Sequence, residues 1–441
     1  MVKQIKTVKI KTLGCRLNRA ESDAIGELLC RAGYELVHPE DTADLTIINS
    51  CTVTNQAAAK TRSSITAAKK SSPAGKIAVM GCYVQEAGDR ILEFEGVNMV
   101  LGNVTKYNIL DYISQIENGQ SIADVKTINE IDWSSSSYST FFEDSIISDS
   151  RRTRANLKVQ EGCDYYCSYC IIPYLRGPSR SRDYKSCIQE ALDLQARGYK
   201  EIVLTGINIG TYNYKDKNLV DLIQGLLETT DLRRIRISSI EPDLVSEALI
   251  DLIGDEKRLC RHLHIPLQHG ANKILKRMNR RYTVEDYSEL VRKVKARMPD
   301  ICLGTDIMTG FPGETVQDYR EMYNNLKKLP VWHYHVFRYS AKKGTRAYEL
   351  SDKVNSKKIK ERAQKLRQLG HKKKVQVLEN YPGKKVEVLG EQLDNKNYVT
   401  GYTDNFIRVK FKGKEQDVNN IRAVSVKSVN NETLLGELGD E

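Results

Sequence analysis

The sequence of 441 residues contains no apolar run that approaches the roughly 20 residues needed for a membrane-spanning helix. Its beginning, MVKQIKTVKIKTLGC, has neither the apolar stretch nor the small-residue cleavage site of a signal peptide. It also lacks an internal repeat of the solenoid type. We therefore expect a cytoplasmic protein without a membrane partner, and we exclude a solenoid architecture.

Charge and composition narrow the class of partner. Hydrophobic residues make up 40% of the chain and charged residues 28%, which is typical of a globular protein. The net charge of +11 favours a polyanionic partner, because displacing counterions from phosphates drives binding. On charge alone, a basic protein that binds no nucleic acid is an equally good interpretation of the sequence.

Ten cysteines are present. In a reducing compartment, cysteines are more often buried, catalytic or metal-bound than paired in disulfides, so their spacing has to decide their role. Four of them lie in apolar segments and are predicted to pack in the core: Cys30, Cys187, Cys260 and Cys302.

The first hundred residues alternate between strand-like and helix-like segments, which predicts an α/β domain with a parallel sheet covered by helices. Three predicted strands each end at a cysteine, namely Cys15, Cys51 and Cys82. Ligands gather at the carboxyl ends of such strands, so these three thiols could converge on one site. The alternative is that these are small buried cysteines at strand ends that form no common site. The predicted strands are KTVKIKTLG, ADLTIINSC and KIAVMGC, and the predicted helices are ESDAIGELLCRAGY and AAAKTRSSITAAKKS.

Later segments predict further domains. Repeated βα units predict a barrel or partial barrel, with strands at EIVLTG, RIRISSI, HLHIPLQ, CLGTDIMTG and YHVFRYS. Short strands and turns after Pro382–Gly383 predict a small all-β barrel or sandwich. We expect boundaries at 1–132 (cluster domain), 133–150 (a serine-rich linker), 151–372 (barrel domain) and 373–441 (β domain).

The segment EGCDYYCSYCIIPYLRG carries the strongest chemical signal, with Cys163, Cys167 and Cys170 in a CxxxCxxC pattern. Three close thiolates can hold three irons of a [4Fe–4S] cluster and leave the fourth iron open for an exchangeable ligand. The alternatives are accidental clustering and a zinc site. Structural zinc requires four ligands, and no fourth Cys or His lies nearby in the sequence.

This motif resembles that of the radical S-adenosylmethionine superfamily, CxxxCxΦC, in which Φ is aromatic and Tyr169 fills that position. The resemblance implies a partial (β/α) barrel of the TIM type. It also implies that the open iron chelates S-adenosylmethionine. One electron then cleaves the cofactor to a 5′-deoxyadenosyl radical that abstracts hydrogen. It assigns the catalytic role to Cys163, Cys167 and Cys170.

The segments TLGCRLNRAES, IINSCTVTNQAAAKTR and MGCYVQ resemble the cysteine motifs of methylthiotransferases, and most closely those of the MtaB-type branch. The resemblance implies a second [4Fe–4S] cluster on Cys15, Cys51 and Cys82. It implies methylthiolation of N6-threonylcarbamoyladenosine next to the anticodon of tRNA. Two departures are Arg16–Leu17, where the branch often has Lys–Val, and Ala57–Ala59, where an acidic residue is common.

Other motifs imply contacts with the cofactor and with RNA. By resemblance, S-adenosylmethionine contacts come from Tyr169, Gly206, Asn208, Ser238, Glu241 and Gln268. The C-terminal run GYTDNFIRVKF resembles a TRAM domain, a small tRNA-binding barrel. Alternation directs Arg408, Lys410 and Lys412 to one face, and Tyr402 and Phe406 could stack on bases. An ordinary barrel with one basic face is the alternative.

We therefore expect a radical methylthiotransferase that uses two [4Fe–4S] clusters and S-adenosylmethionine, as a monomer, with an electron donor, a sulfur donor and a tRNA anticodon stem-loop as partners. The alternatives are methylthiolation of isopentenyladenosine or of a ribosomal-protein aspartate, a non-catalytic iron–sulfur RNA-binding protein, and a zinc-stabilised RNA-binding module. The same-face pairs His262/His264 and His333/His335 could bind metal but are more typical of core or groove residues.

Overall fold

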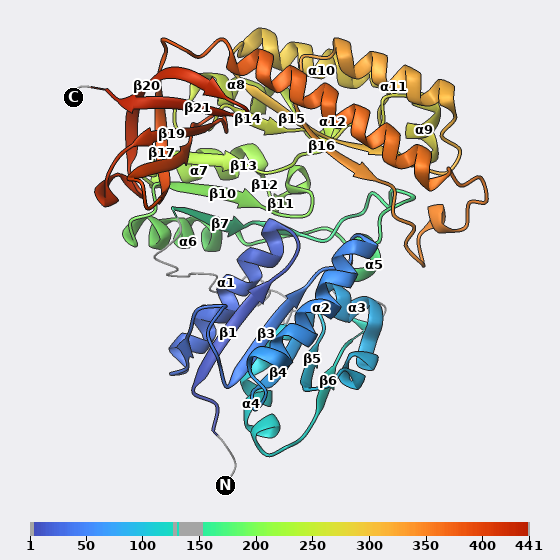
Figure 1. Cartoon of the computed structure of the whole chain (residues 1–441), viewed down its shortest axis with the longest axis vertical. Helices are drawn as coiled ribbons and strands as arrows, with labels where there is room; N and C mark the ends of the chain where they lie inside the picture. The colour runs from blue at the N-terminus through green and yellow to red at the C-terminus, as the bar shows by residue number, and fades with distance from the viewer. Residues whose placement is uncertain (1–3, 127–129, 132–152, 440–441) are drawn as a thin grey trace.

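The computed structural model describes residues 4–126, 130–131 and 153–439, arranged in three parts (Figure 1). The serine-rich segment 133–150, predicted to be a linker, lies outside the described residues. Within the described ranges, no helix has the length and apolar character needed to cross a membrane.

The N-terminal domain is built on a six-stranded parallel sheet, which confirms the prediction from strand–helix alternation. The strand order is β2-β1-β3-β4-β5-β6. The strands are β1 (Thr7–Thr12), β2 (Glu35–Leu36), β3 (Leu45–Ser50), β4 (Lys76–Gly81), β5 (Val97–Leu101) and β6 (Ile122–Asp124). The helices are α1 (Arg16–Arg31), α2 (Asn55–Ser71), α3 (Cys82–Ala87) and α4 (Ile109–Glu117).

Helices cover both faces of this sheet. Ile47 and Ile48 follow one another in β3, so their side chains point to opposite faces. Ile47 packs in one core with Ile25 of α1 and Ile113 of α4, and Ile48 packs in a second core with Ile65 of α2. Burial on both sides explains why β3 is a continuous apolar run rather than an alternating one.

The central domain has six parallel strands in two three-stranded sheets, β13-β10-β7 and β14-β15-β16. Parallel bridges Ile235↔Leu259 and Ser239↔His264 connect the sheets, so the strands form one curved partial barrel, as predicted. The strands are β7 (Arg154–Lys158), β10 (Glu201–Thr205), β13 (Arg234–Ile237), β14 (His262–His264), β15 (Cys302–Thr309) and β16 (His333–Arg338).

Helices surround the partial barrel, and short elements lie at its rim. The longer helices are α6 (Tyr184–Ala196), α7 (Leu219–Thr229), α8 (Glu247–Asp255), α10 (Val284–Arg297), α11 (Val316–Lys328) and α12 (Ser356–Leu378). The short elements are α5 (Ile172–Arg176), α9 (Asn272–Arg277), β8 (Gln160–Glu161), β9 (Arg180–Ser181), β11 (Asn213–Tyr214) and β12 (Lys217–Asn218).

The C-terminal part is a closed barrel in the order β17-β18-β19-β21-β20, which confirms the predicted small β-barrel. We expected an antiparallel barrel from the sequence, and four of its strand pairs are antiparallel, but the pair β19–β21 is parallel and corrects that expectation. The strands are β17 (Lys385–Leu393), β18 (Tyr398–Tyr402), β19 (Arg408–Lys412), β20 (Ile421–Asn430) and β21 (Thr433–Leu438).

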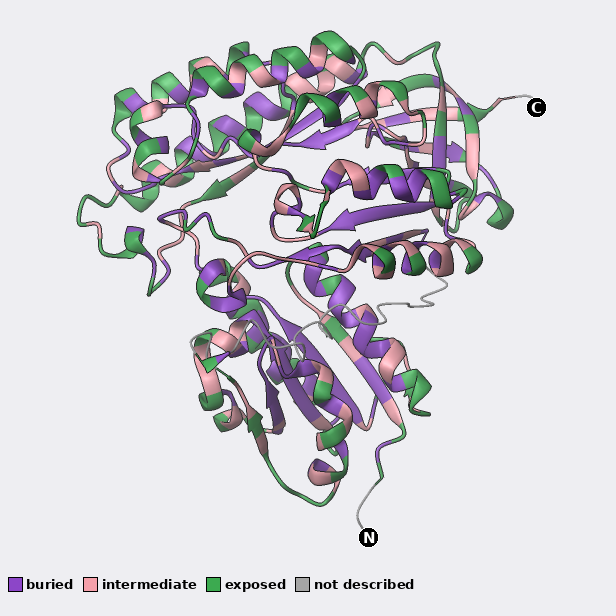
Figure 2. Ribbon diagram, turned by 180° about the vertical axis from the view of Figure 1, so that it is seen from behind, coloured by how far each residue is buried: buried purple, intermediate pink, exposed green. Residues whose placement is uncertain are grey.

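The central domain contacts both other parts. Helix α1 of the N-terminal domain lies against β7 and β10 (Figure 1). Arg234 and Arg236, on β13, donate hydrogen bonds to backbone carbonyls of the C-terminal barrel, among them those of Tyr402 and Asp404. In Figure 2 the strands of the sheets are largely buried, whereas the outer helices have one buried and one exposed face.

Candidate functional site

The CxxxCxxC trio (Cys163, Cys167 and Cys170) lies in the loop between β8 and α5. The Cys163 N–H donates to the Gly177 carbonyl at 3.1 Å, which ties the beginning of the loop to the residue after α5. Gly162 has a φ of +72°, and a Cβ there would lie 1.8 Å from the Pro178 carbonyl oxygen. Only glycine fits this turn, so the backbone positions the first cysteine of the motif.

The three thiols of this loop share one environment. Burial, together with the nearby Cys167 and Cys163, raises the pKa of Cys170 to about 12. Burial likewise raises the pKa of Cys167, although the neighbouring Arg280 guanidinium counteracts it. Thiols that bind metal must lose their protons, so loading this loop with iron is expected to release protons.

The strand-end trio (Cys15, Cys51 and Cys82) gathers at the carboxyl edge of the N-terminal sheet. Cys15 caps α1, Cys51 follows β3 and Cys82 begins α3. Their strands β1, β3 and β4 are direct neighbours in the sheet. Burial raises the pKa of Cys51 to about 11, and the proximity of Cys82 and Cys15 adds to the shift. The structure therefore brings together the three strand-end thiols that the sequence singled out.

Cys15 is the exposed member of the strand-end trio, whereas Cys51 and Cys82 are buried. The accessible side of this trio is therefore the side of Cys15.

Among the described residues, three potential ligand atoms lie within 4.8 Å of one another in one group, that of His264, Asp306 and His335. Neither cysteine trio is as closely spaced as this group. The choice between zinc and an iron–sulfur cluster at the two trios therefore rests on the sequence motifs.

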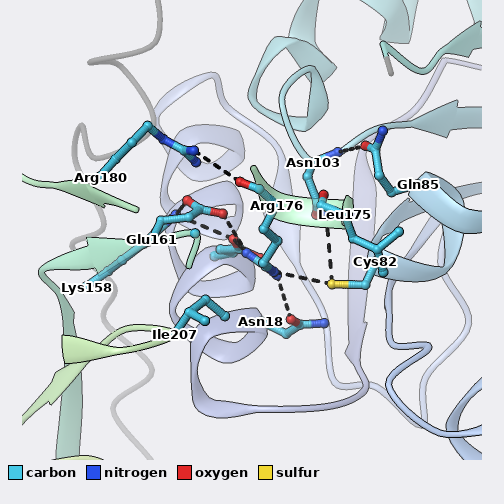
Figure 3. A network of polar contacts seen from close by, with 12 residues as sticks. Asn18, Cys82, Gln85, Asn103, Lys158, Glu161, Leu175, Arg176, Arg180 and Ile207 are labelled. Atoms are coloured by element: carbon cyan, nitrogen blue, oxygen red, sulfur yellow. Dashed lines mark hydrogen bonds and ion pairs between the residues drawn. The ribbon is translucent and has the colours of Figure 1, made fainter. Parts of the chain in front are cut away.

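Arg176, the last residue of α5, reaches across the domain interface to the strand-end trio (Figure 3). Its Nε donates to the Cys82 sulfur at 3.3 Å, and one terminal nitrogen donates to Asn18 Oδ1 at 2.9 Å. Cys82 also packs against Ile171 and Leu175, which directly follow the CxxxCxxC trio. The two candidate metal sites thus meet at one interface between the domains.

Buried charges surround Arg176. Its other terminal nitrogen lies 2.7 Å from both Glu21 of α1 and Glu161 of β8. Lys106 pairs with Glu21 at 2.7 Å, and Lys158 pairs with both carboxylates. All five side chains are at most 3% exposed. Three cations face two carboxylates, and the network extends to the Cys82 sulfur.

A second interdomain contact holds the Cys51 loop. Lys342, which follows β16 and is buried, donates to Thr52 Oγ1 at 2.8 Å and to Glu86 at 3.1 Å. The Asn55 N–H donates to Ser340 Oγ at 3.1 Å. The loop after Cys51 is therefore held between the N-terminal and central domains.

Arg280 organises the other side of the CxxxCxxC trio. It donates to the Cys167 sulfur at 3.1 Å and to the Tyr169 hydroxyl at 3.5 Å, and it pairs with Glu241. Burial raises the pKa of Glu241, while Arg280 counteracts the shift. The predicted cofactor residues Tyr169 and Glu241 thus meet around one guanidinium beside the trio.

The remaining predicted cofactor residues leave polar atoms without a partner. Both side-chain polar atoms of Asn208 and the Ser238 hydroxyl are buried and lack a hydrogen bond among the described residues. Orphaned buried groups of this kind call for a ligand. Gly206 lies against Gln160, whose Oε1 accepts from the Asn208 N–H at 2.9 Å. Gln268 has a φ of +65°. These residues fit a polar cofactor such as S-adenosylmethionine.

Asp306 connects the two histidine pairs in the barrel. It lies 3.0 Å from His264 Nε2 and 3.4 Å from His335 Nδ1, and the imidazole rings stack at 5.0 Å. The hydrogen bonds from both rings hold the pKa of Asp306 below its usual range against desolvation. His262 instead packs on Phe406, with 5.0 Å between ring centroids.

The predicted RNA-binding residues divide into two environments. Arg408 and Lys412 of β19 are exposed and alternate with buried Val409. Lys410 lies on the same face and pairs with Asp394 at 2.8 Å.

Phe406 and Tyr402 stack on each other at 4.9 Å where the barrel meets the central domain. Phe406, with a φ of +64°, also faces the guanidinium of Arg236 at 5.1 Å. Both rings are half-buried, so they lie at an interdomain contact and Arg408 and Lys412 lie on the open surface.

Sequence comparison identifies relatives over nearly the whole chain. Residues 157–326 match the Radical SAM superfamily, and residues 7–102 match the uncharacterized protein family UPF0004. The chain is 38% identical to the threonylcarbamoyladenosine tRNA methylthiotransferase MtaB of Bacillus subtilis, over 95% of this chain and 93% of that protein. It is 32% identical to a tRNA-2-methylthio-N(6)-dimethylallyladenosine synthase of Clostridium tetani, over 98% and 96% of the two chains.

Structure comparison finds the same architecture in the radical S-adenosylmethionine methyltransferase TsrM of Kitasatospora setae, solved with cobalamin and a [4Fe–4S] cluster bound. The TM-score is 0.56 at 16% identity, over 76% of this chain and 75% of that one. At this identity the likeness is one of fold.

Several residues of the site were missed by sequence reasoning. Arg176 stands six residues after Cys170 in the same segment, but nothing local distinguishes it from a surface arginine. Glu21 lies within the TLGCRLNRAES motif, but the motif gave no sign that Glu21 pairs with Arg176, and Arg280 lies in a charged stretch far from both cysteine motifs. Only the packing of the domains brings these charges to the sulfurs.

Proposed function

This chain belongs to the radical S-adenosylmethionine methylthiotransferase family, and we propose that it adds a methylthio group to C2 of N6-threonylcarbamoyladenosine beside the anticodon of tRNA. The relative named for that reaction is 38% identical, and the relative named for dimethylallyladenosine is 32% identical. That difference favours the threonylcarbamoyl substrate.

The observation that carries the proposal is the meeting of two cysteine trios at one interface. Arg176 contacts the Cys82 sulfur at 3.3 Å, and the residue after it accepts a hydrogen bond from the Cys163 N–H. Joining a sulfur group to an unactivated ring carbon involves two tasks, which are making a radical and delivering sulfur. Two adjacent metal sites, each with three thiols, support such a division of labour.

The CxxxCxxC trio is proposed to hold one [4Fe–4S] cluster. Tyr169, Asn208 and Ser238 would take the S-adenosylmethionine, because their polar groups gather beside the trio or lack a protein partner. Arg280 would orient this side of the cofactor site, because it binds both Glu241 and the Cys167 sulfur. Gly206 and Gln268 supply backbone close to the cofactor.

The strand-end trio is proposed to hold a second [4Fe–4S] cluster. When bound, the two clusters and two molecules of S-adenosylmethionine would supply the methyl group of the product, a carbon radical that takes the hydrogen from C2, and a site for the sulfur that replaces it. Arg176 and Lys342 each donate a hydrogen bond across the domain interface. These contacts would hold the two metal sites in a fixed relative position. Electrons and sulfur come from external donors, as for other enzymes of this chemistry.

The tRNA is proposed to approach across the C-terminal barrel and α12. Exposed Arg408 and Lys412 would bind phosphates. The adenosine beside the anticodon lies in a loop, so moving it into the partial barrel of the central domain would break few base pairs.

The test is a nucleoside analysis under anaerobic conditions. Reconstituted protein, S-adenosylmethionine and a reductant are incubated with anticodon stem-loops carrying threonylcarbamoyladenosine or dimethylallyladenosine, and the digested RNA is measured by mass spectrometry. We expect the methylthio product from the threonylcarbamoyl RNA, and none from a Cys167→Ala variant. Product from the dimethylallyl RNA alone would contradict the proposal. A failure to form 5′-deoxyadenosine would point to a non-catalytic iron–sulfur protein.

A further inference from the structure

Three arginine guanidiniums surround the ring of Phe406. Those of Arg236, Arg154 and Arg16 lie 5.1, 5.4 and 5.9 Å from its centroid. They come from β13, from β7 and from the first residue of α1. The three main parts of the fold thus meet at one strongly cationic place inside the protein.

Two of these arginines have counter-ions. Arg236 pairs with Glu201 at 2.6 Å, and Arg154 pairs with Glu391 at 2.6 Å and lies 4.0 Å from Glu201. Their charges are therefore neutralised by two carboxylates that are themselves largely buried.

Arg16 is different. Among the described residues it forms no ion pair or hydrogen bond, and its contact is with the Phe406 ring. Its side chain is exposed, as is that of Cys15. Arg16 therefore presents an unneutralised positive charge beside the exposed Cys15 of the strand-end trio.

A pocket of about 530 Å³ shares Arg154 and Tyr402 with the surroundings of Phe406 and is also lined by Glu391, Arg408, Thr153, Gln392 and Thr400, but not by Arg16. Arginine binds a carboxylate through paired, charge-assisted hydrogen bonds. An anion bound by Arg16 would neutralise the one charge of the three arginines that has no counter-ion among the described residues.

We infer that Arg16 is a specificity-determining residue that binds the carboxylate of the threonylcarbamoyl group on the target adenosine. This inference rests on the proposed function. On adenine, C2 and C6 flank the ring nitrogen N1 and C6 carries the substituted N6, so a base that presents C2 to the strand-end trio carries its N6 substituent close by. Arg16 directly follows Cys15 and extends from that trio toward Phe406. A dimethylallyl group has no charge to offer this guanidinium.

The test is a double-mutant cycle. The positive charge is removed from Arg16 of the protein, and the negative charge is removed from the threonylcarbamoyl carboxylate of the RNA. Holoenzyme with S-adenosylmethionine is titrated with stem-loops carrying threonylcarbamoyladenosine, its methyl ester, dimethylallyladenosine or unmodified adenosine, and Kd is measured by anisotropy. The wild type should bind the free acid roughly 10- to 150-fold more tightly than the ester, the range for a hydrogen bond between charged groups. Arg16→Gln should bind the two equally, and Arg16→Lys should keep most of the preference.

Controls separate the possible failures. Arg31→Gln changes an exposed arginine at the other end of α1 and should leave every Kd unchanged. Iron content shows whether Arg16→Gln retains both clusters, and the ester comparison on the wild type needs no variant at all. Equal weakening of all four RNAs by Arg16→Gln would reassign Arg16 to a backbone phosphate and overturn the inference. A wild type indifferent to esterification would overturn it too, even if it methylthiolates the free acid. A wild type inactive on the free acid would instead contradict the proposed function.

Discussion

The guanidinium of Arg176 lies 3.3 Å from the sulfur of Cys82, although the two residues belong to different domains and are 94 positions apart in the chain. Arg176 ends the helix that follows the CxxxCxxC trio, and Cys82 begins the helix that follows β4. One side chain therefore links the segments that carry both candidate metal sites. A cation beside a coordinating sulfur is a recognised way for a protein to tune a cluster.

Replacing Arg176 with glutamine is expected to affect stability and redox behaviour together. Glu21 and Glu161 would lose a buried partner, and breaking a buried pair costs about 3–5 kcal/mol. Loss of the positive charge and the N–H···S contact should make the reduction potential of the strand-end cluster more negative. Denaturant unfolding and a potentiometric titration followed by electron paramagnetic resonance measure the two effects.

Arg182→Gln is the matched control. Arg182 is also buried and pairs with Glu190, but both residues lie in the central domain. The control should lower stability and leave the potential of the strand-end cluster unchanged. An unchanged potential in Arg176→Gln as well would show that the contact with Cys82 has no electronic effect.

Glu314 provides a prediction about acid stability. Its carboxylate accepts from the Gly310 N–H at 2.6 Å and from the Thr309 hydroxyl at 3.0 Å, and it pairs with Arg362. His269, whose Nε2 lies 3.4 Å from Glu314 Oε2, and these neighbours outweigh burial and lower the pKa of Glu314 below its ordinary value.

A lowered pKa in the folded state means that the stabilisation is complete above the unfolded value of about 4.3 and is lost as the pH falls through the lower folded value. Glu314→Gln should therefore lower the thermal midpoint at pH 7 and flatten its decline between about pH 5 and pH 3. The exposed Glu289→Gln is the control. This assignment would be wrong if the thermal midpoint of Glu314→Gln declined between about pH 5 and pH 3 as steeply as that of the wild type.

Glu314 anchors the FPGET turn by accepting a hydrogen bond from the Gly310 N–H. The sequence predicted some strands and missed others for a physical reason. Strands with apolar runs, such as β3 and β4, were recognisable because both of their faces are buried. The five-residue β7 was not predicted, because its sequence RANLK alternates polar and apolar residues and is too short to stand out.

Salt dependence tests the basic face of the C-terminal barrel. Arg408→Gln and Lys412→Gln should each weaken tRNA binding and reduce the slope of log K against log salt by about 0.7 to 0.9 for each phosphate that the variant no longer neutralises. Lys410→Gln should have a smaller effect, because Lys410 already pairs with Asp394. Titrations at several salt concentrations check this order. An equal effect of all three substitutions would argue against phosphate binding by Arg408 and Lys412 alone.

The geometry of the site depended on contacts that no local pattern encodes. The gathering of Cys15, Cys51 and Cys82 could be anticipated, since each follows a strand of a parallel sheet. The meeting of the two trios could not, because it depends on pairs such as Arg176 and Glu21, which are 155 positions apart. Alternation predicted outward-facing basic residues on β19, but it gave no sign that Phe406 would lie at an interdomain contact.

The number of clusters tests the central claim most directly. Iron and acid-labile sulfide should be measured on anaerobically reconstituted wild type and on two triple variants, one for each trio changed to alanine. Two cubane clusters predict about eight irons per chain, and each triple variant should retain about four. A wild type with about four irons, or a triple variant that loses all of its iron while remaining folded, would contradict the account of two independent three-thiolate sites.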